Sequence, residues 1–357
     1  MALGGAFACA GLRSRGLAIW SGQVIGEGPM DMVVTPGFIS HLDLQWESVA
    51  YRRFVRQLAA CGRVIRYDKR GTGLSDPVSA VPGLDQRVDD LCAVLDAAGS
   101  ARAVVLGFSE GGPTAIRFAS RLPRRTLGLI LYGTASMPPP PDIARRFRKV
   151  AGRWGQGATL EMLAPSLLPS STQVETAAAL ERASASPAMA AALVEAVICT
   201  DVSSLLAEVA VPTLVIHRQG DPLITVEQGR YLAEHIPGAE YAELGGVDHV
   251  PWVGDTDAVL AAIERFVRRF GGERRVAGAG AHPRAARAAT GWGSLTEAER
   301  GIALLVAEGL SNPAVAARLF VSRHTVESHL KHAYAKLGVS SPVELAALTL
   351  REGGKNP

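Results

Sequence analysis

Three residues that could form a catalytic triad occur in the order serine, aspartate, histidine. Ser109 lies in a Gly-x-Ser-x-Gly motif, Asp221 follows a run of apolar residues, and His249 lies in a later loop. A histidine can take the proton of a serine hydroxyl, and a carboxylate can hold the imidazole in the tautomer that this transfer needs. The three residues therefore predict acyl transfer with Ser109 as the nucleophile. Asp248 is an alternative acid, although it adjoins His249 and would have to fold back on it.

The residues around Ser109 are typical of a sharp turn between a strand and a helix. The motif Gly107-Phe-Ser-Glu-Gly111 separates a short apolar run from a helical pattern. Small flanking residues allow this turn, and the N–H groups at the start of the following helix can stabilise an oxyanion. We expect the N–H groups of Glu110 and Phe38 to form the oxyanion hole. The carboxylate of Glu110 would then lie near the positive end of the helix dipole.

The segment that must position these residues alternates short strands with longer helical patterns. Segments 49–60 and 84–98 carry apolar residues at helical spacing. The strands are short and apolar on both faces, as in parallel sheets covered by helices on both sides. They are expected at 31–35, 63–67, 103–106, 129–132, 213–217 and 240–244. The pattern predicts an α/β fold with a mostly parallel sheet.

A different pattern interrupts this alternation before the last two strands. Four prolines follow Met137, and the sequence from 142 to 208 has only helical patterns. An all-helical insertion between two core strands would form a lid over one edge of the sheet. We expect this lid at about 138–208.

From about Gln23 to Phe270 the chain resembles the α/β-hydrolase fold. The resemblance rests on the serine motif, the histidine loop and the stretch Tyr67-Asp-Lys-Arg-Gly-Thr-Gly-Leu-Ser-Asp76. Segment 36–47 is similar to actinobacterial hydrolase domains that are often fused to regulatory modules. The resemblance implies a hydrolase domain at 1–270 with a helical lid. It also implies a small acyl compound, such as an ester or a lactone, as the ligand or substrate.

The remaining residues divide into a linker and a small helical domain. Residues 271–293 are rich in Gly, Ala and Arg and have no apolar period, which predicts a linker. Residues 294–357 predict a small helical bundle whose third helix begins at Ser322 and stops at Gly338. A single apolar stripe along that helix would be buried, made of Val326, Leu330, Ala333 and Leu337.

Residues 295–350 resemble the helix-turn-helix domain of LuxR-type transcription regulators. Among the matching segments are Val306-Ala-Glu-Gly-Leu-Ser-Asn312 and Lys336-Leu-Gly-Val339. The resemblance implies that Glu327, Ser328 and Lys331 face base edges and that Thr325, His329 and Lys336 approach phosphates. Because a single module of this size makes few phosphate contacts, we expect a homodimer on a two-fold site in double-stranded DNA.

The charge distribution favours the same partner. Segment 271–357 has 11 basic and seven acidic residues, a balance of +4, whereas segment 1–270 has 26 basic and 27 acidic residues, a balance of −1. Nucleic-acid binding needs positive charge where the protein meets phosphate. The excess lies in the segment that carries the helix-turn-helix pattern.

Other motifs are absent from the sequence. It has no His-Glu-x-x-His motif, no cysteine cluster and no phosphate-binding Gly-x-x-x-x-Gly-Lys, so we expect no metal and no cofactor. No apolar stretch approaches the ~18 residues that a membrane span needs, so we expect no membrane contact. Four cysteines far apart predict reduced thiols and a cytoplasmic protein.

Three hypotheses remain open. The preferred one is a transcription regulator whose hydrolase domain binds or processes a small acyl compound. The second is a serine hydrolase of esterase type with a DNA-binding tail of minor importance. The third keeps the fold without the chemistry, so that the pocket binds a ligand without turnover.

Overall fold

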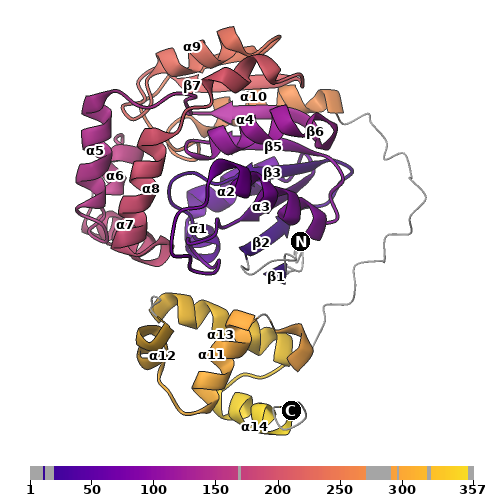
Figure 1. Ribbon diagram of the computed structural model, residues 1–357, viewed down its shortest axis with the longest axis vertical. Helices are drawn as coiled ribbons and strands as arrows, with labels where there is room; N and C mark the ends of the chain where they lie inside the picture. The colour runs from indigo at the N-terminus through magenta and orange to yellow at the C-terminus, as the bar shows by residue number, and fades with distance from the viewer. Residues whose placement is uncertain are drawn as a thin grey trace.

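The computed structural model describes residues 11–12, 20–167, 170–270, 291–295, 297–319 and 323–352. Two domains are present, an N-terminal α/β domain and a smaller C-terminal helical domain (Figure 1). Most of the predicted linker, residues 271–290, lies outside the described residues.

The N-terminal domain is built on an eight-stranded sheet with the order β1-β2-β4-β3-β5-β6-β7-β8. Strands β1 and β2 are antiparallel to their neighbours at one edge, and β3 to β8 run parallel. The predicted mostly parallel sheet is confirmed. The strands are β1 (Gly11–Leu12), β2 (Trp20–Ile25), β3 (Asp31–Thr35), β4 (Arg63–Tyr67), β5 (Ala103–Phe108), β6 (Thr126–Tyr132), β7 (Thr213–Arg218) and β8 (Glu240–Leu244).

Helices cover both faces of this sheet because its central strands are apolar on both sides. Val105 and Leu129 belong to the core on one face, whereas Val104 and Ile130 belong to the core on the other. Residues of α3 and α4 pack on the first face, and residues of α2 and α10 on the second. The helices of this layer are α1 (Leu42–Glu47), α2 (Val49–Leu58), α3 (Leu84–Ala97), α4 (Gly111–Arg121), α9 (Val226–His235) and α10 (Thr256–Val267), with short turns η1 (Pro123–Arg125) and η3 (Arg268–Phe270).

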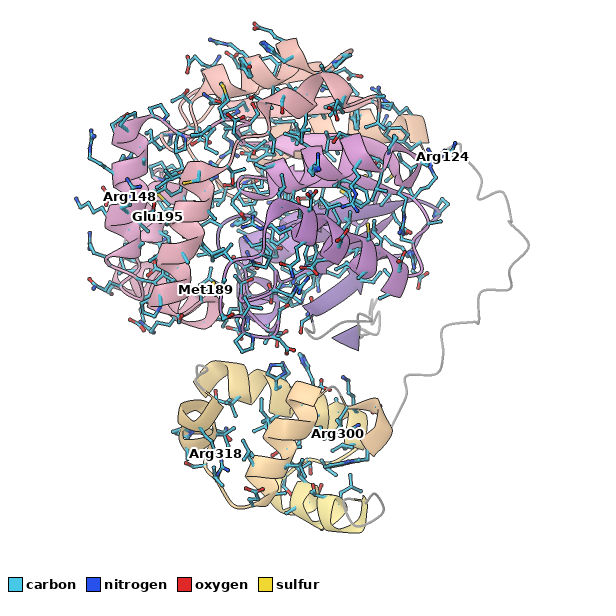
Figure 2. All side chains as sticks on the ribbon, viewed as in Figure 1. Arg124, Arg148, Met189, Glu195, Arg300 and Arg318 are labelled. Atoms are coloured by element: carbon cyan, nitrogen blue, oxygen red, sulfur yellow. The ribbon has the colours of Figure 1, made fainter. Side chains whose placement is uncertain are left out.

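The insertion between β6 and β7 is helical over its described residues. It contains α5 (Pro141–Ala151), α6 (Thr159–Leu163), α7 (Ser171–Ser184), α8 (Pro187–Cys199) and η2 (Ser203–Glu208). Ile143, Phe147 and Leu193 form a core here that also includes Phe38 from the loop after β3. Figure 2 shows Arg148 of α5 beside Glu195 of α8, and two hydrogen bonds of 2.8 and 2.9 Å join their side chains. The lid is therefore a packed unit in contact with the rest of the domain.

The C-terminal domain has its own small core. It consists of η4 (Trp292–Ser294), α11 (Glu297–Ala307), α12 (Asn312–Leu319), α13 (Arg323–Leu337) and α14 (Pro342–Glu352). Val326, Leu330 and Ala333 are buried, as the apolar stripe predicted, whereas the fourth predicted residue, Leu337, is half-buried and packs against the same core. Trp292 packs against the same core, and the N–H of Gly291 donates a 2.9 Å hydrogen bond to the carbonyl of Lys336. Residues 291–293, which the sequence assigned to the linker, thus belong to the helical domain, because the Trp292 indole is apolar enough to join its core.

Two properties concern the described chain as a whole: whether any helix could span a membrane, and whether its cysteines are paired. Within the described part of the chain, no single helix could span a membrane; α7 and α8 meet the length and composition criteria only as a pair bent by 87°. Cys61, Cys92 and Cys199 are free thiols.

Candidate functional site

The turn that carries Ser109 is strained, and its neighbours are small for steric reasons. Ser109 has a φ of 51° and is the only non-glycine residue with positive φ in the described part of the chain. A side chain at Gly111 would come within 2.4 Å of the Thr35 carbonyl oxygen, and one at Gly112 within 2.0 Å of Thr134 Oγ1. Backbone strain of this kind persists where the surroundings fix it, as at catalytic nucleophiles. The turn therefore places the Ser109 side chain at the C-terminal end of β5.

The structure brings the three predicted triad residues together. His249 Nε2 lies 2.7 Å from Ser109 Oγ, and His249 Nδ1 lies 2.7 Å from Asp221 Oδ2. These distances allow the Ser109 hydroxyl to donate to Nε2 while Nδ1–H donates to the carboxylate. His249 is fully buried, and Asp221 and Ser109 are only 5% and 7% exposed. The imidazole is thus oriented to accept a proton from the serine.

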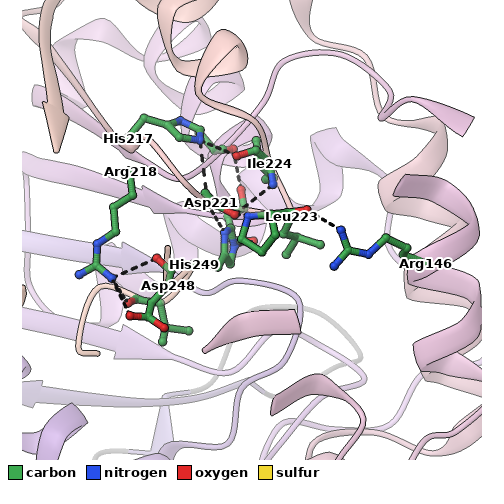
Figure 3. Close-up of polar contacts among 12 residues, drawn as sticks. Arg146, His217, Arg218, Asp221, Leu223, Ile224, Asp248 and His249 are labelled. Carbon is green, nitrogen blue, oxygen red and sulfur yellow. Dashed lines mark hydrogen bonds and ion pairs between the residues drawn. The ribbon is translucent and has the colours of Figure 1, made fainter. Parts of the chain in front are cut away.

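The carboxylate of Asp221 is held in its charged form. Burial alone would raise its pKa, but the charge of His249, the hydrogen bond from His249 and the backbone N–H of Leu223 together lower it. The second oxygen, Oδ1, accepts hydrogen bonds from the N–H groups of Leu223 (2.9 Å) and Ile224 (3.2 Å) (Figure 3). A charged, fixed carboxylate of this kind can stabilise the imidazolium that forms during acyl transfer.

The alternative acid, Asp248, points away from the imidazole and has a different set of partners. Its side chain accepts hydrogen bonds from the N–H (3.0 Å) and hydroxyl (2.8 Å) of Ser166, and it lies 3.7 Å from Arg218 Nη1. Figure 3 shows Asp248 beside Arg218, separate from the contact between Asp221 and His249. Since Ser166 belongs to the lid, Asp248 ties the histidine loop to the lid.

A cavity opens beside the serine. Its volume is about 780 Å³ including the part open to solvent. Ser109, Phe38 and Glu110 line one side of it, and lid residues such as Ile143 and Phe147 line the other. Phe38 is only 5% exposed and is packed edge-on against Trp154 of the lid. A mostly apolar cavity at a nucleophile is suited to a small acyl compound.

Two family models match this chain, one in each domain. The model of the family described as "Serine aminopeptidase, S33", a group of α/β hydrolases, matches residues 32–250. The chain belongs to this family. The model described as "Bacterial regulatory proteins, luxR family" matches residues 293–349, so the C-terminal domain is a LuxR-type helix-turn-helix domain.

Three known proteins are each similar to a part of this chain. A candidate HTH-type transcriptional regulator of Mycobacterium bovis is 54% identical over 98 residues, which are 28% of this chain and 9% of that protein. The chain therefore matches under a tenth of that relative's length. The 3-oxoadipate enol-lactonase 2 of Acinetobacter baylyi is 28% identical over 212 residues, 58% of this chain and 79% of the enzyme. The solved enol-lactonase of Burkholderia xenovorans LB400 has 25% identity and a TM-score of 0.61, covering 70% of this chain and 97% of that one.

Two residues of the hydrolase domain that the sequence did not single out contact the Glu110 side chain. Lys69 Nζ and Arg87 Nη1 each form an ion pair with one oxygen of this carboxylate. Burial would raise the pKa of Glu110, but the charges of Arg87 and Lys69 and their hydrogen bonds lower it. The carboxylate is thus ion-paired beside the pocket. The one sequence signal for this cluster was that Lys69 lies within the stretch Tyr67–Asp76, on which the family resemblance rests.

In the LuxR-type domain, the residues expected to face DNA bases differ in exposure. Lys331 is exposed, and Glu327 is half-buried. The side chains of Thr325 and Ser328 lie outside the described set, although both residues belong to α13. Lys331 is therefore the described member of this group best placed to meet a partner.

Of the three residues expected to approach phosphates, Lys336 has an intramolecular partner and His329 is buried. Lys336 Nζ donates to both carboxylate oxygens of Glu299, at 2.8 and 2.6 Å. His329 is only 9% exposed, and burial lowers its pKa to about 4. A neutral imidazole and an ion-paired ammonium contribute less to phosphate binding than free cations do.

His332 Nε2 of α13 lies 3.6 Å from Oδ2 of Asp43, in the first turn of α1 of the hydrolase domain. Across the described residues, no three His, Cys, Asp or Glu side chains are grouped as metal ligands would be.

Proposed function

We propose that the protein is a one-component transcription regulator whose hydrolase domain binds and hydrolyses a small ester or lactone. One observation carries this proposal: a buried Ser109–His249–Asp221 arrangement with two contacts of 2.7 Å opens on a cavity in a chain that ends in a LuxR-type domain. A nucleophile with this geometry supports turnover, and a DNA-binding domain on the same chain supports a regulatory use of the ligand.

The proposed reaction proceeds by an acyl-enzyme. Ser109 Oγ attacks the carbonyl carbon while His249 Nε2 takes the hydroxyl proton, and Asp221 stabilises the imidazolium. The N–H groups of Glu110 and Phe38 are proposed to stabilise the oxyanion. His249 then gives the proton to the leaving alkoxide oxygen, which departs as an alcohol or, from a lactone, stays attached as a hydroxyl. Water repeats the sequence, releases the acid and restores Ser109.

The proposed substrate class rests on the cavity and on the relatives. The lining is mostly apolar, with contributions from the lid, and one relative is named as an enol-lactonase. Small acyl esters and lactones match such a lining because their carbon chains are apolar and their carbonyl is the single electrophile.

For the C-terminal domain we propose that α13 enters the major groove of double-stranded DNA. Glu327, Ser328 and Lys331 would face base edges, and a carboxylate at 327 would prefer the amino group of cytosine. Thr325, His329 and Lys336 remain the proposed phosphate contacts, with Lys336 and His329 weakened by their intramolecular environment. A homodimer on a two-fold site and a cytoplasmic location belong to the same proposal.

A second candidate is a serine hydrolase with a tail of minor importance, which the same triad geometry favours. A third, a sensor without turnover, keeps the pocket and loses the chemistry. Reaction with a fluorophosphonate probe separates the third from the other two. We expect covalent labelling of the wild type and none of Ser109→Ala, whereas the control Ser136→Ala should label like the wild type. Absence of wild-type labelling would contradict a working nucleophile.

The regulatory function is tested by selecting bound fragments from random duplex DNA. We expect one enriched sequence, bound at least about 1,000-fold more tightly than random duplex at the same salt concentration, because specific and non-specific binding differ by this much in known regulators. The affinity should fall steeply with salt as counterions are released. Equal affinity for selected and random duplexes would favour the hydrolase with a minor tail.

A further inference from the structure

The pocket beside Ser109 contains a charged cluster that the triad does not use. Glu110 lies between Lys69 and Arg87, and the side chains of all three are at most 12% exposed. Lys69 Nζ also donates a 2.7 Å hydrogen bond to the Gly37 carbonyl oxygen. One carboxylate therefore faces two cations in a largely buried position.

Two further carboxylates, Asp68 and Asp90, lie near this cluster. The Asp68 carboxylate accepts hydrogen bonds from the N–H groups of Leu42 (3.1 Å) and Leu74 (3.0 Å). The neighbouring Arg70 is already neutralised, because it forms two hydrogen bonds of 2.8 and 2.5 Å with the carboxylate of Asp90. Burial lowers the pKa of Lys69, and the adjacent guanidinium of Arg87 adds to this effect, while the charges of Glu110 and Asp68 oppose it. Arginine keeps its proton under all ordinary conditions. Since the Glu110 carboxylate is shared between two cations, an anion in the cavity would be stabilised by charge-assisted hydrogen bonds from the Arg87 guanidinium.

Arg87 is the cation of this cluster that lines the cavity beside Ser109, and not all of its N–H groups have partners. Its Nε donates a 3.0 Å hydrogen bond to the Pro82 carbonyl oxygen, and its Nη1 contacts Glu110. Within the described part of the chain, Nη2 has no hydrogen-bond partner. Arg87 and Ser109 line the same cavity, so a molecule bound at the serine lies in a pocket that the Arg87 side chain also borders.

We propose that Arg87 is a specificity-determining residue that binds a carboxylate of the substrate while Ser109 attacks its ester or lactone carbonyl. This inference rests on the proposed hydrolase function and narrows the substrate class to acyl compounds that also carry a carboxylate. Glu110, which is itself paired with Lys69, holds the guanidinium in place, and the substrate carboxylate would accept hydrogen bonds from Arg87 Nη2. The apolar lining contacts the carbon chain between the two groups.

The test compares two esters that differ only in charge. Monomethyl glutarate carries a carboxylate, and methyl 5-oxohexanoate has a methyl ketone in its place, with the same number of heavy atoms. Calorimetric titration of Ser109→Ala measures binding without turnover. We expect monomethyl glutarate to bind about 10- to 100-fold more tightly, as charge-assisted hydrogen bonds imply. Equal binding of the two esters by Ser109→Ala would overturn the proposal, whatever the outcome of labelling at Ser109.

Variants of Arg87 then assign the effect to one side chain. In Ser109→Ala carrying Arg87→Met the preference for the glutarate ester should disappear, and Arg87→Lys should restore part of it because it keeps the charge. Arg121→Met is the matched control, since Arg121 is a surface arginine of α4 paired with Asp89. A preference that survives Arg87→Met in folded protein would contradict the assignment. Loss of labelling at Ser109 with the preference intact would instead contradict only the hydrolytic function.

Discussion

The two domains present their candidate functional groups in opposite ways. In the hydrolase domain Ser109, Asp221 and His249 are at most 7% exposed and contact one another directly. In the LuxR-type domain the clearest candidate for base contact, Lys331, is exposed and would meet its partner only when DNA is bound. A buried site can thus be described from its internal distances, whereas a docking surface is defined by a partner that lies outside the chain. The hydrolase site is therefore open to sharper tests.

The largest effect is expected for the acid of the triad. Asp221→Asn should lower kcat for 4-nitrophenyl butyrate by about 10³–10⁴-fold, because the amide no longer holds the imidazole in the required tautomer. Asp248→Asn is the matched control, with a much smaller expected loss, since Asp248 contacts Ser166 and Arg218. If Asp248→Asn were the more damaging change in steady-state assays, the acid would have been assigned to the wrong residue.

A pH effect on stability is expected next, from the LuxR-type domain. Burial lowers the pKa of His329 to about 4, while the surrounding Glu299 and Asp43 raise it and His332 and His41 lower it. Between pH 6.5 and pH 4 the unfolded chain binds a proton that the folded domain does not, so stability is present above pH 6.5 and lost as the pH falls towards 4. The loss is on the order of 3 kcal/mol.

Chemical denaturation of wild type and His329→Gln between pH 4.5 and pH 7.5 measures this effect. The wild-type LuxR-type domain should lose stability on acidification, and the glutamine variant should lose less because its side chain does not titrate. Parallel pH profiles for the two proteins would contradict a buried neutral His329.

The ion pair of Lys336 distinguishes a structural role from a DNA contact. Lys336→Met leaves the carboxylate of Glu299, itself 4% exposed, without this cation. We expect a destabilisation of about 1–3 kcal/mol, with Lys336→Met/Glu299→Gln more stable than Lys336→Met because it removes both charges. A lower salt slope of DNA binding in the single variant, with unchanged stability, would assign Lys336 to phosphate instead.

The smallest effect is expected at the exposed face of α13. Lys331→Ala should weaken binding to the selected duplex by about 1 kcal/mol or somewhat more, the usual range for one base or phosphate contact. Lys149→Ala, an exposed lysine of the lid, is the control for a simple change of net charge. Equal losses in the two variants, measured by fluorescence anisotropy, would show that α13 has no special part in binding.

The sequence predicted the fold well because the signals for it are local. Buried parallel strands are short and apolar on both faces, so the expected 31–35, 63–67 and 240–244 agree with β3, β4 and β8 at both ends. Strand-to-helix turns likewise need small residues at fixed positions, which made the position of Ser109 predictable.

Contacts between distant side chains could not be predicted in this way. Lys69 and Arg87 lie 41 and 23 residues from Glu110, and Glu299 lies 37 residues from Lys336. A charged residue in a single sequence looks the same whether it faces solvent or an ion-pair partner. From the sequence, the Glu110 carboxylate was expected near a helix dipole and Lys336 near a phosphate. Their partners in the fold, Lys69 and Arg87 for Glu110 and Glu299 for Lys336, could not be predicted.

In the proposed regulator, occupation of the pocket at Ser109 must change the affinity for DNA. One measurement tests this coupling directly. Affinity for the selected duplex is compared before and after the fluorophosphonate probe occupies Ser109, with Ser109→Ala treated in the same way. We expect labelling to change the wild-type affinity at least about fivefold, in the range of known coupling between sites, and to leave Ser109→Ala unchanged. Full labelling with unaltered DNA affinity would contradict a regulator controlled by its hydrolase pocket.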